Sequence, residues 1–283
     1  MTKESNIVFG NKKLFGIKKR EIIRQGIGNF HVIADFDRTL TYAHDKDGKE
    51  VPSLISVLRH KHYISPEYSV AAQALADKYR PIEDDNSIPM EEKKKAMMEW
   101  WTKHFDLLIR SGLNKKHLEQ IVDSGVVRVR EGVLGFLDYL HENNIPLVIM
   151  SSNGLGGDSI EMFLQRHKKL YKNIYVVSNS YKWGKNGDAI GVKQPVIHSM
   201  NKDETALPEK IHRVVKERRN VLLLGDSLGD LGMVSGFDYE NLISIGFLNN
   251  RMDENIKQYK EKFDIIITKD DDFGFVNRLV EEL

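Results

Sequence analysis

Two aspartates lie on either side of a single phenylalanine, directly after the apolar run FHVIA at residues 30–34. Such a run is typical of a strand that is buried on both faces. A carboxylate that lacks a partner at the end of a buried strand costs several kcal/mol or shifts its pKa. Something in the folded protein must therefore compensate the charges of Asp35 and Asp37.

Other polar side chains follow two further apolar runs. Ser151 and Ser152 end one run, and Asp226 and Asp230 lie in GDSLGD at the end of the other. Because ligands of parallel α/β sheets bind beyond the carboxyl ends of the strands, we expect all these side chains at one edge. Four carboxylates repel one another unless a cation lies between them, and Mg²⁺ suits carboxylates, waters and a phosphate. The pattern predicts a magnesium site.

Each motif taken alone has an ordinary alternative. An isolated D-x-D is common, and an EF-hand loop needs a preceding helix and a glycine at its sixth position, where this sequence has Leu40. GDSLGD can simply begin a helix, with Asp226 or Ser227 as its cap. The glycines of SSNGLGG, at residues 151–157, can form a turn and do not match G-x-G-x-x-G. The combination is more specific than any single motif.

The composition is that of an ordinary globular protein, with 283 residues of which 41% are hydrophobic and 29% charged. The sequence has no cysteine, which excludes disulfides, zinc–thiolate sites and thiol catalysis and favours a cytoplasmic location. A net charge of +1 predicts no general attraction to nucleic acid or membranes. No apolar stretch is long enough for a membrane span, and the oligomeric state is left open.

Six short apolar runs alternate with helical patterns over much of the chain. The expected strands lie at residues 30–36, 145–152, 174–179, 220–227, 242–248 and 263–270. The expected helices between them lie at residues 131–144, 158–170 and 273–283. This alternation predicts an α/β fold with a doubly wound, mostly parallel sheet.

Residues 43–128 interrupt the alternation with helical segments at 66–80, 89–111 and 114–125. We interpret them as a helical cap inserted after the first strand, with residues 1–42 and 129–283 forming the catalytic core. A smaller interruption at 180–199 contains the turn signal KNGD and predicts a β-hairpin.

These motifs resemble those of the haloacid dehalogenase superfamily. DFDRTLT is similar to its first signature, D-x-D-x-T, and GDSLGD is similar to its acidic motif, G-D-x-x-x-D. Ser151 stands where the second motif has Ser or Thr, and Lys202 lies in the interval of the third motif, a lysine.

A closer resemblance is to the cytosolic pyrimidine 5′-nucleotidases, the cytosolic 5′-nucleotidase III family. It extends from about residue 30 to the C-terminus and rests on the stretches ADFDRTLT, MMEWWTKHFDLL, VIHSMNKDETAL, LLLGDSLGDLGM and IGFLNNRMDENIKQYKEKFDIII. It implies a Mg²⁺-dependent 5′-nucleotidase that removes the phosphate from pyrimidine nucleoside monophosphates.

The resemblance also implies a role for each acid. Asp35 attacks phosphorus and forms an aspartyl-phosphate, while Asp37 protonates the leaving oxygen and later takes a proton from water. Asp35, Asp226 and the backbone carbonyl of Asp37 hold Mg²⁺. Asp230 supports the metal site, either directly or by orienting metal-bound water and Lys202.

The remaining implied residues bind the substrate. Ser151 hydrogen-bonds a phosphoryl oxygen, with Ser152 lining the site, although sequence alone does not decide between these neighbours. Lys202 supplies positive charge to the phosphate and to Asp35. Glu99 contacts the base, and Trp100 or Trp101 stacks on it.

Three alternatives remain open at this point. The same chemistry can serve a sugar phosphate, a phosphoserine-like metabolite or a methylated nucleotide. The enzyme can transfer the phosphoryl group to a nucleoside instead of water. A binding module without activity would be expected to have lost the nucleophile or the proton donor, and both aspartates are present.

Overall fold

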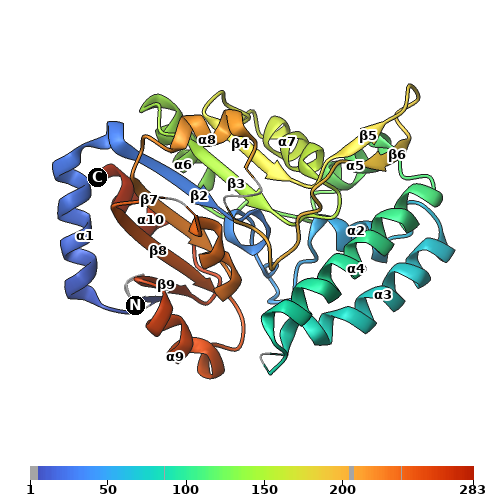
Figure 1. Cartoon of the computed structure of the whole chain (residues 1–283), viewed down its shortest axis with the longest axis horizontal. Coiled ribbons are helices and arrows are strands. Elements are labelled where there is room, and N and C mark those ends of the chain that lie inside the picture. Colours follow the sequence, from blue (N-terminus) through green and yellow to red (C-terminus); the bar gives the residue numbers. More distant parts are fainter. Residues whose placement is uncertain (1–5, 86, 204–206, 237) are drawn as a thin grey trace.

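A computed structural model describes residues 6–85, 87–203, 207–236 and 238–283. Its centre is a seven-stranded sheet in the order β1-β9-β8-β7-β2-β3-β4 (Figure 1). All neighbouring strands are parallel except β1, which pairs antiparallel with β9. The strands are β1 (Ile7–Phe9), β2 (Phe30–Ala34), β3 (Leu147–Ser151), β4 (Ile174–Ser178), β7 (Asn220–Gly225), β8 (Asn241–Leu248) and β9 (Ile265–Thr268).

Helices cover both faces of the sheet. Successive side chains of a strand point to opposite faces, so each buried strand contributes apolar side chains to two cores. In β2, Val32 and Ala34 join the larger hydrophobic core on one face, whereas Ile33 packs into a second core on the other. The larger core includes side chains of α1 (Lys12–Gln25), α6 (Val133–Glu142), α7 (Gly157–Arg166) and α10 (Gly274–Glu281). The opposite face carries α8 (Glu209–Val215), the helical turn η5 (Leu228–Val234) and α9 (Met252–Lys262).

Four further helices lie beyond the carboxyl ends of the strands (Figure 1). They are α2 (Leu54–His60), α3 (Pro66–Asp84), α4 (Met90–Arg110) and α5 (Lys115–Asp123). The long helices α3 and α4 share a small hydrophobic cluster of their own, formed by Ala76, Tyr79, Met97 and Trp100. The helical insert is therefore present, while its boundaries at residues 43 and 128 stay a prediction.

The predicted fold class is confirmed, and each of the six expected strands is present. The hairpin is also present as β5 (Tyr181–Trp183) and β6 (Ala189–Val192), which pair antiparallel. One detail of the prediction is wrong, because the insert follows the second strand of the chain rather than the first. The three residues of β1 are too few to give a periodic pattern, so the sequence analysis missed them.

Among the described residues, none of the helices is long and apolar enough to cross a membrane.

Candidate active site

The two acidic motifs meet because their strands are neighbours. β2 and β7 are parallel, with Ala34 opposite Leu224 in the register. The backbone N–H of Asp35 continues the pairing by donating to the carbonyl of Leu224 at 2.9 Å. Asp35 and Asp226 therefore leave the sheet side by side, as expected for the carboxyl ends of adjacent parallel strands.

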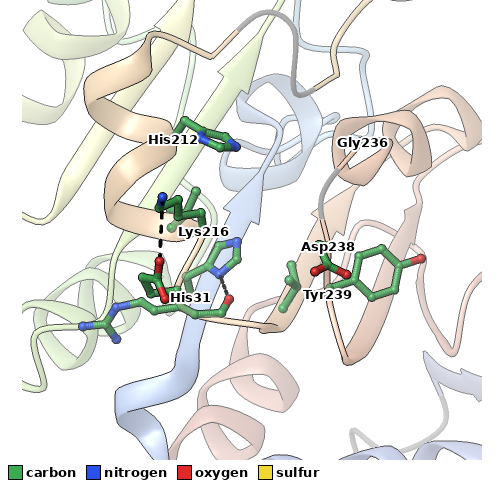
Figure 2. Close-up of a pocket in the computed structure, with 10 residues that line it drawn as sticks. His31, His212, Lys216, Gly236, Asp238 and Tyr239 are labelled. Carbon is green, nitrogen blue, oxygen red and sulfur yellow. Dashed lines mark hydrogen bonds and ion pairs between the residues drawn. The ribbon is translucent and has the colours of Figure 1, made fainter.

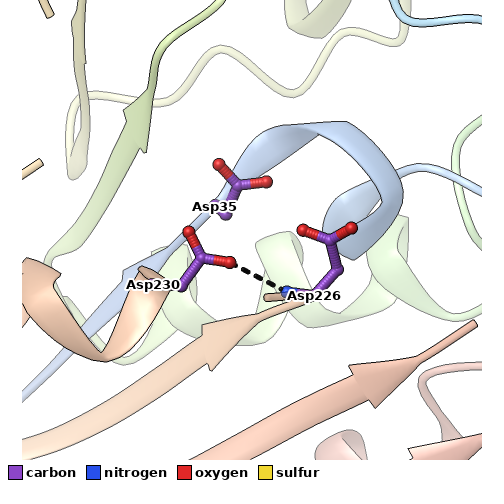
Figure 3. Close-up of side chains that lie close together, drawn as sticks. All are labelled: Asp35, Asp226 and Asp230. Atoms are coloured by element: carbon purple, nitrogen blue, oxygen red, sulfur yellow. Dashed lines mark hydrogen bonds between the residues drawn. The ribbon is translucent and has the colours of Figure 1, made fainter. Parts of the chain in front are cut away.

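Three carboxylates form one cluster at this edge (Figure 3). Oxygen atoms of Asp35, Asp226 and Asp230 all lie within 4.8 Å of one another. Asp230 is held in place because its Oδ2 accepts hydrogen bonds from the backbone N–H groups of Asp226 (3.1 Å) and Ser227 (2.9 Å). The Ser227 hydroxyl donates to the same oxygen at 2.9 Å.

Lys202 connects two members of the cluster. Its Nζ donates to Oδ1 of Asp35 at 2.7 Å and to Oδ1 of Asp230 at 2.6 Å. Only 6% of Lys202 is exposed. Burial alone would lower the pKa of Lys202, but the charges of Asp230 and Asp35 raise it above its usual value. The lysine therefore stays protonated and fixes the orientation of Asp35.

One ammonium does not neutralise three clustered carboxylates, of which Asp35 and Asp230 are buried and Asp226 is half-buried. Burial, followed by the charge of Asp230, raises the pKa of Asp226 to about 7. Burial also raises the pKa of Asp35, although the Lys202 charge acts in the opposite direction. A hard divalent cation beside Asp35 and Asp226 would remove this surplus of negative charge, so the donor set fits Mg²⁺.

Asp37 lies outside the three-carboxylate cluster, on the turn η3 (Phe36–Leu40) that follows Asp35. Its Oδ1 is buried and has no hydrogen-bond partner among the described residues. Burial raises the pKa of Asp37 to about 6, against the lowering effects of Arg38, Lys202 and the backbone N–H of Leu54. Leu54 begins α2, so the helical insert approaches the site at this aspartate.

The two serines follow β3, the other neighbour of β2. Ser151 is 2% exposed, and its Oγ accepts a hydrogen bond from the backbone N–H of Asn153 at 3.1 Å. Ser152 is half-buried and comes directly after the strand. The sequence analysis missed Asn153, whose Nδ2 is buried without a hydrogen-bond partner among the described residues.

The aromatic pair of α4 divides between two environments. Trp100 is buried between α3 and α4 and stacks on Tyr79, with ring centroids 5.9 Å apart. Trp101 lies against the loop after β3, where a Cβ added at Gly154 would be 2.6 Å from the indole ring. Glu99 is half exposed and forms an ion pair with Lys103 on its own helix. Its contact with a base stays a prediction.

A buried arginine that the sequence analysis missed holds the turn after Asp35. The guanidinium of Arg130 is completely buried and forms an ion pair with Asp270 at 2.9 Å. It donates to the backbone carbonyls of Arg38, Thr39 and Thr41 at 2.6, 2.9 and 3.2 Å. Arg38 has a left-handed backbone conformation, with φ of 62°, which the contacts of Arg130 stabilise.

A pocket of about 320 Å³ lies at the opposite, amino-terminal end of the strands (Figure 2). Its wall includes His31 of β2, Val221 of β7 and His212 of α8. His31 donates from Nδ1 to the carbonyl of Arg218 at 2.7 Å, and burial is the main cause that lowers the pKa of His31 to about 4. This pocket contains none of the clustered acids, so we do not assign it to the site.

Comparisons with known proteins agree with this geometry. The model of the pyrimidine 5′-nucleotidase (UMPH-1) family matches residues 38–283. The 7-methylguanosine phosphate-specific 5′-nucleotidase of Homo sapiens is 36% identical over 265 residues, which cover 92% of this chain and 87% of that protein. The putative cytosolic 5′-nucleotidase 3 of Caenorhabditis elegans is 28% identical, with 98% of this chain and 75% of that protein covered.

Solved structures give the same result. Cytosolic 5′-nucleotidase IIIB bound to cytidine superposes with a TM-score of 0.89 and 28% identity, covering 98% of this chain and 93% of that chain. A phospho-aspartyl intermediate analogue of phosphoserine phosphatase has a TM-score of 0.51 at 17% identity, with 87% of this chain and 96% of that chain covered, and shares the fold. The predicted family and enzyme class are confirmed: with a fold like that of haloacid dehalogenase-type hydrolases, the chain belongs to the pyrimidine 5′-nucleotidase (UMPH-1) family of phosphomonoesterases.

Proposed function

We propose that this protein removes the 5′-phosphate from nucleoside monophosphates, with Mg²⁺ as cofactor and Asp35 as nucleophile. The observation that carries the proposal is the cluster of Asp35, Asp226 and Asp230, whose oxygens lie within 4.8 Å of one another, with the ammonium of Lys202 donating to Asp35 and Asp230. Asp35 is thereby a buried, oriented carboxylate at the end of β2. The surplus negative charge beside it requires a cation.

In the first step, a carboxylate oxygen of Asp35 forms a bond to phosphorus while the bond to the 5′-oxygen breaks. Asp37 gives its proton to the departing oxygen, for which its raised pKa of about 6 is suited. In the second step, water attacks the phosphorus of the aspartyl-phosphate, Asp37 takes the proton, and phosphate leaves while the Asp35 carboxylate re-forms.

The other residues bind and orient. Lys202 holds Asp35 and balances charge on the phosphoryl oxygens, and the Ser151 hydroxyl donates to one of them. Asp35, Asp226 and the backbone carbonyl of Asp37 would hold Mg²⁺, with Asp230 orienting Lys202 and the loop that carries Asp226. When bound, the metal screens the approach of two anions and polarises the phosphoryl group.

For the base, we propose a pyrimidine first and 7-methylguanine second. The family model and the cytidine-bound neighbour support CMP and UMP. The 36% identical relative, which is named for 7-methylguanosine phosphate, supports 7-methyl-GMP. Trp101 is an aromatic side chain beside the loop after β3, and a cationic methylated base would stack on it well. We place residues 43–128 over the substrate as a cap and the protein in the cytosol, in line with the cytosolic relatives.

The decisive experiment is a phosphate-release panel with Mg²⁺ and with EDTA. The substrates are CMP, UMP, 7-methyl-GMP, AMP, GMP, phosphoserine and a sugar phosphate. We expect turnover of a pyrimidine or 7-methylguanine nucleotide. EDTA should abolish this turnover, and so should Asp35→Asn, which should still fold. Equal or faster turnover of the non-nucleotides would overturn the substrate proposal.

Two controls separate the alternatives. Unchanged turnover in Asp35→Asn would overturn its role as nucleophile. Adding a nucleoside acceptor and searching for its monophosphate tests whether the phosphoryl group is transferred to a nucleoside instead of water.

A further inference from the structure

A second pocket lies on the helical insert, where the end of α2 meets α3. It has a volume of about 460 Å³, and its polar lining comprises Arg59, His60, His62, Ser69, Gln73 and Asp77. The active-site acids and Lys202 are not part of its wall. Any ligand that binds there would therefore occupy a site separate from the catalytic cluster.

The central feature of this pocket is a buried arginine with few partners. Arg59 is 5% exposed, and its guanidinium donates one long hydrogen bond, from Nη2 to the Ser56 hydroxyl at 3.3 Å. Its Nε has no hydrogen-bond partner among the described residues. A buried cation is costly unless an anion or several acceptors compensate it.

Arg130 shows what a compensated buried arginine looks like in the same protein. It pairs with Asp270 and donates to four backbone carbonyls, at distances from 2.6 to 3.2 Å. In the described parts of the chain, Arg59 forms no ion pair with a carboxylate. The comparison identifies Arg59 as a cation whose partner is missing from its own surroundings.

The charges around Arg59 favour an added anion. Burial and then the charge of Arg80 lower the pKa of Arg59, while Tyr68 and Asp77 act in the opposite direction. Burial, Arg59 and Arg80 lower the pKa of His60. Asp77 is the one carboxylate in the wall, and its Oδ1 accepts from the Gln73 amide at 2.6 Å.

We propose that this pocket binds an anion, namely the phosphate group of a small metabolite, through the guanidinium of Arg59. The planar guanidinium presents paired donors that match two phosphate oxygens. The exposed side chain of Val70, in the same wall, can contact an apolar part of the ligand. This proposal is independent of the proposed activity, because it uses none of the catalytic residues.

The test is a titration of the full chain with inorganic phosphate at constant ionic strength, followed by the ring ¹⁵N resonances of its histidines. His60 and His62 lie in the pocket and report binding there. We expect a saturable shift of the His60 and His62 resonances.

Matched variants make the assignment specific. Arg59→Met should weaken the response of His60 and His62 at least tenfold, and Arg110→Met, on an exposed face of α4, should leave it unchanged. Arg80→Met should weaken it less than Arg59→Met does. If Arg59→Met does not fold, the wild-type titration and Arg80→Met decide. A response that is not saturable in the wild type, or is the same in Arg59→Met or Arg80→Met, would overturn the proposal.

Discussion

The position of Asp230 depends on a residue without a side chain. A Cβ added at Gly225 would lie 2.4 Å from the Cβ of Asp230 and 2.8 Å from its Oδ2. Gly225→Ala must therefore displace Asp230 and, through it, Lys202. Because a misplacement of about 1 Å can cost about a hundredfold in rate, we expect a loss of turnover of about that size in a phosphate-release assay.

Gly135 in α6 provides the matched control for that substitution. An added Cβ there has no neighbour within 4 Å in the described structure. Gly135→Ala should keep full turnover and raise the free energy of unfolding by about 0.5–1 kcal/mol, since alanine is the better helix former. Full activity in Gly225→Ala would show that Asp230 can move without harm.

The role of Asp37 as a proton donor can be separated from a general effect on the site. Asp37→Asn should lower turnover of a nucleoside monophosphate by about 10²–10⁴-fold. In the first turnover, before the aspartyl-phosphate is hydrolysed, the loss in the rate of leaving-group release should be much smaller for p-nitrophenyl phosphate, whose leaving group needs no proton. An equal loss for both substrates in that first turnover would contradict the role of general acid.

At the scale of residues, sequence analysis could predict that Asp35, Asp226 and Asp230 lie together, because their motifs follow apolar runs that become neighbouring strands, while their catalytic roles stay a prediction. It could not predict Arg130 or Gly225, since their importance arises from groups distant in sequence or from a missing side chain. Arg130 contacts a turn about ninety positions earlier and Asp270 far later in the chain. A charged residue in VRVREG gives no signal of complete burial.

Among the elements, the contact between α4 and the loop after β3 is tightly packed. A Cβ on Gly154 would lie 2.6 Å from the Trp101 ring and 2.9 Å from Ile55. Gly154→Ala should therefore push the loop and α4 apart and impair turnover. Trp101→Leu should remove part of this clash, so that the double variant is more active than the sum of the two single losses predicts. Strict additivity in the double-mutant cycle would contradict the contact.

The turn after β2 depends on the hydrogen bonds and the ion pair of Arg130. Arg130→Met removes the ion pair of Asp270 and one hydrogen-bond donor from each of the carbonyls of Arg38 and Thr39. We expect the free energy of unfolding, measured in urea, to fall by about 3–5 kcal/mol. Arg166→Met, which breaks the exposed pair with Asp123, should cost only about 0–1 kcal/mol.

Helices of the insert could be predicted where a proline or a cap marked their start. The side chain of Ser65 accepts a hydrogen bond from the backbone N–H of Tyr68, and Pro66 is the first residue of α3. Pro89 instead precedes α4 as its cap residue. The seven residues of α2 gave no signal, because so short a helix is defined by its packing rather than by its periodicity.

For the molecule as a whole, two buried histidines predict a loss of stability in acid. Burial lowers the pKa of His31 to about 4 and that of His104 to about 3. In the unfolded chain both protonate near their usual pKa of about 6.5. Between these values the unfolded state binds more protons than the folded state, so their contribution to stability falls as the pH decreases below about 6.5.

The buried carboxylates with raised pKa values act in the opposite direction, so the test must isolate one histidine. We measure the unfolding free energy in urea at about pH 7.5 and at about pH 5 and subtract the second value from the first. This signed difference should be smaller in His104→Gln than in the wild type. The same pH dependence in the variant and the wild type would contradict the assignment.

The antiparallel strand β1 covers the edge of the sheet at β9. β9 pairs with β8 on one side and with β1 on the other, and it presents Ile265, Ile266 and Ile267 in a row. A sheet margin with unpaired backbone groups and such side chains is a template on which a second molecule can add its own strand. By covering this edge, β1 hinders self-association, and a variant whose β1 cannot pair with β9 should accumulate as large particles in light scattering.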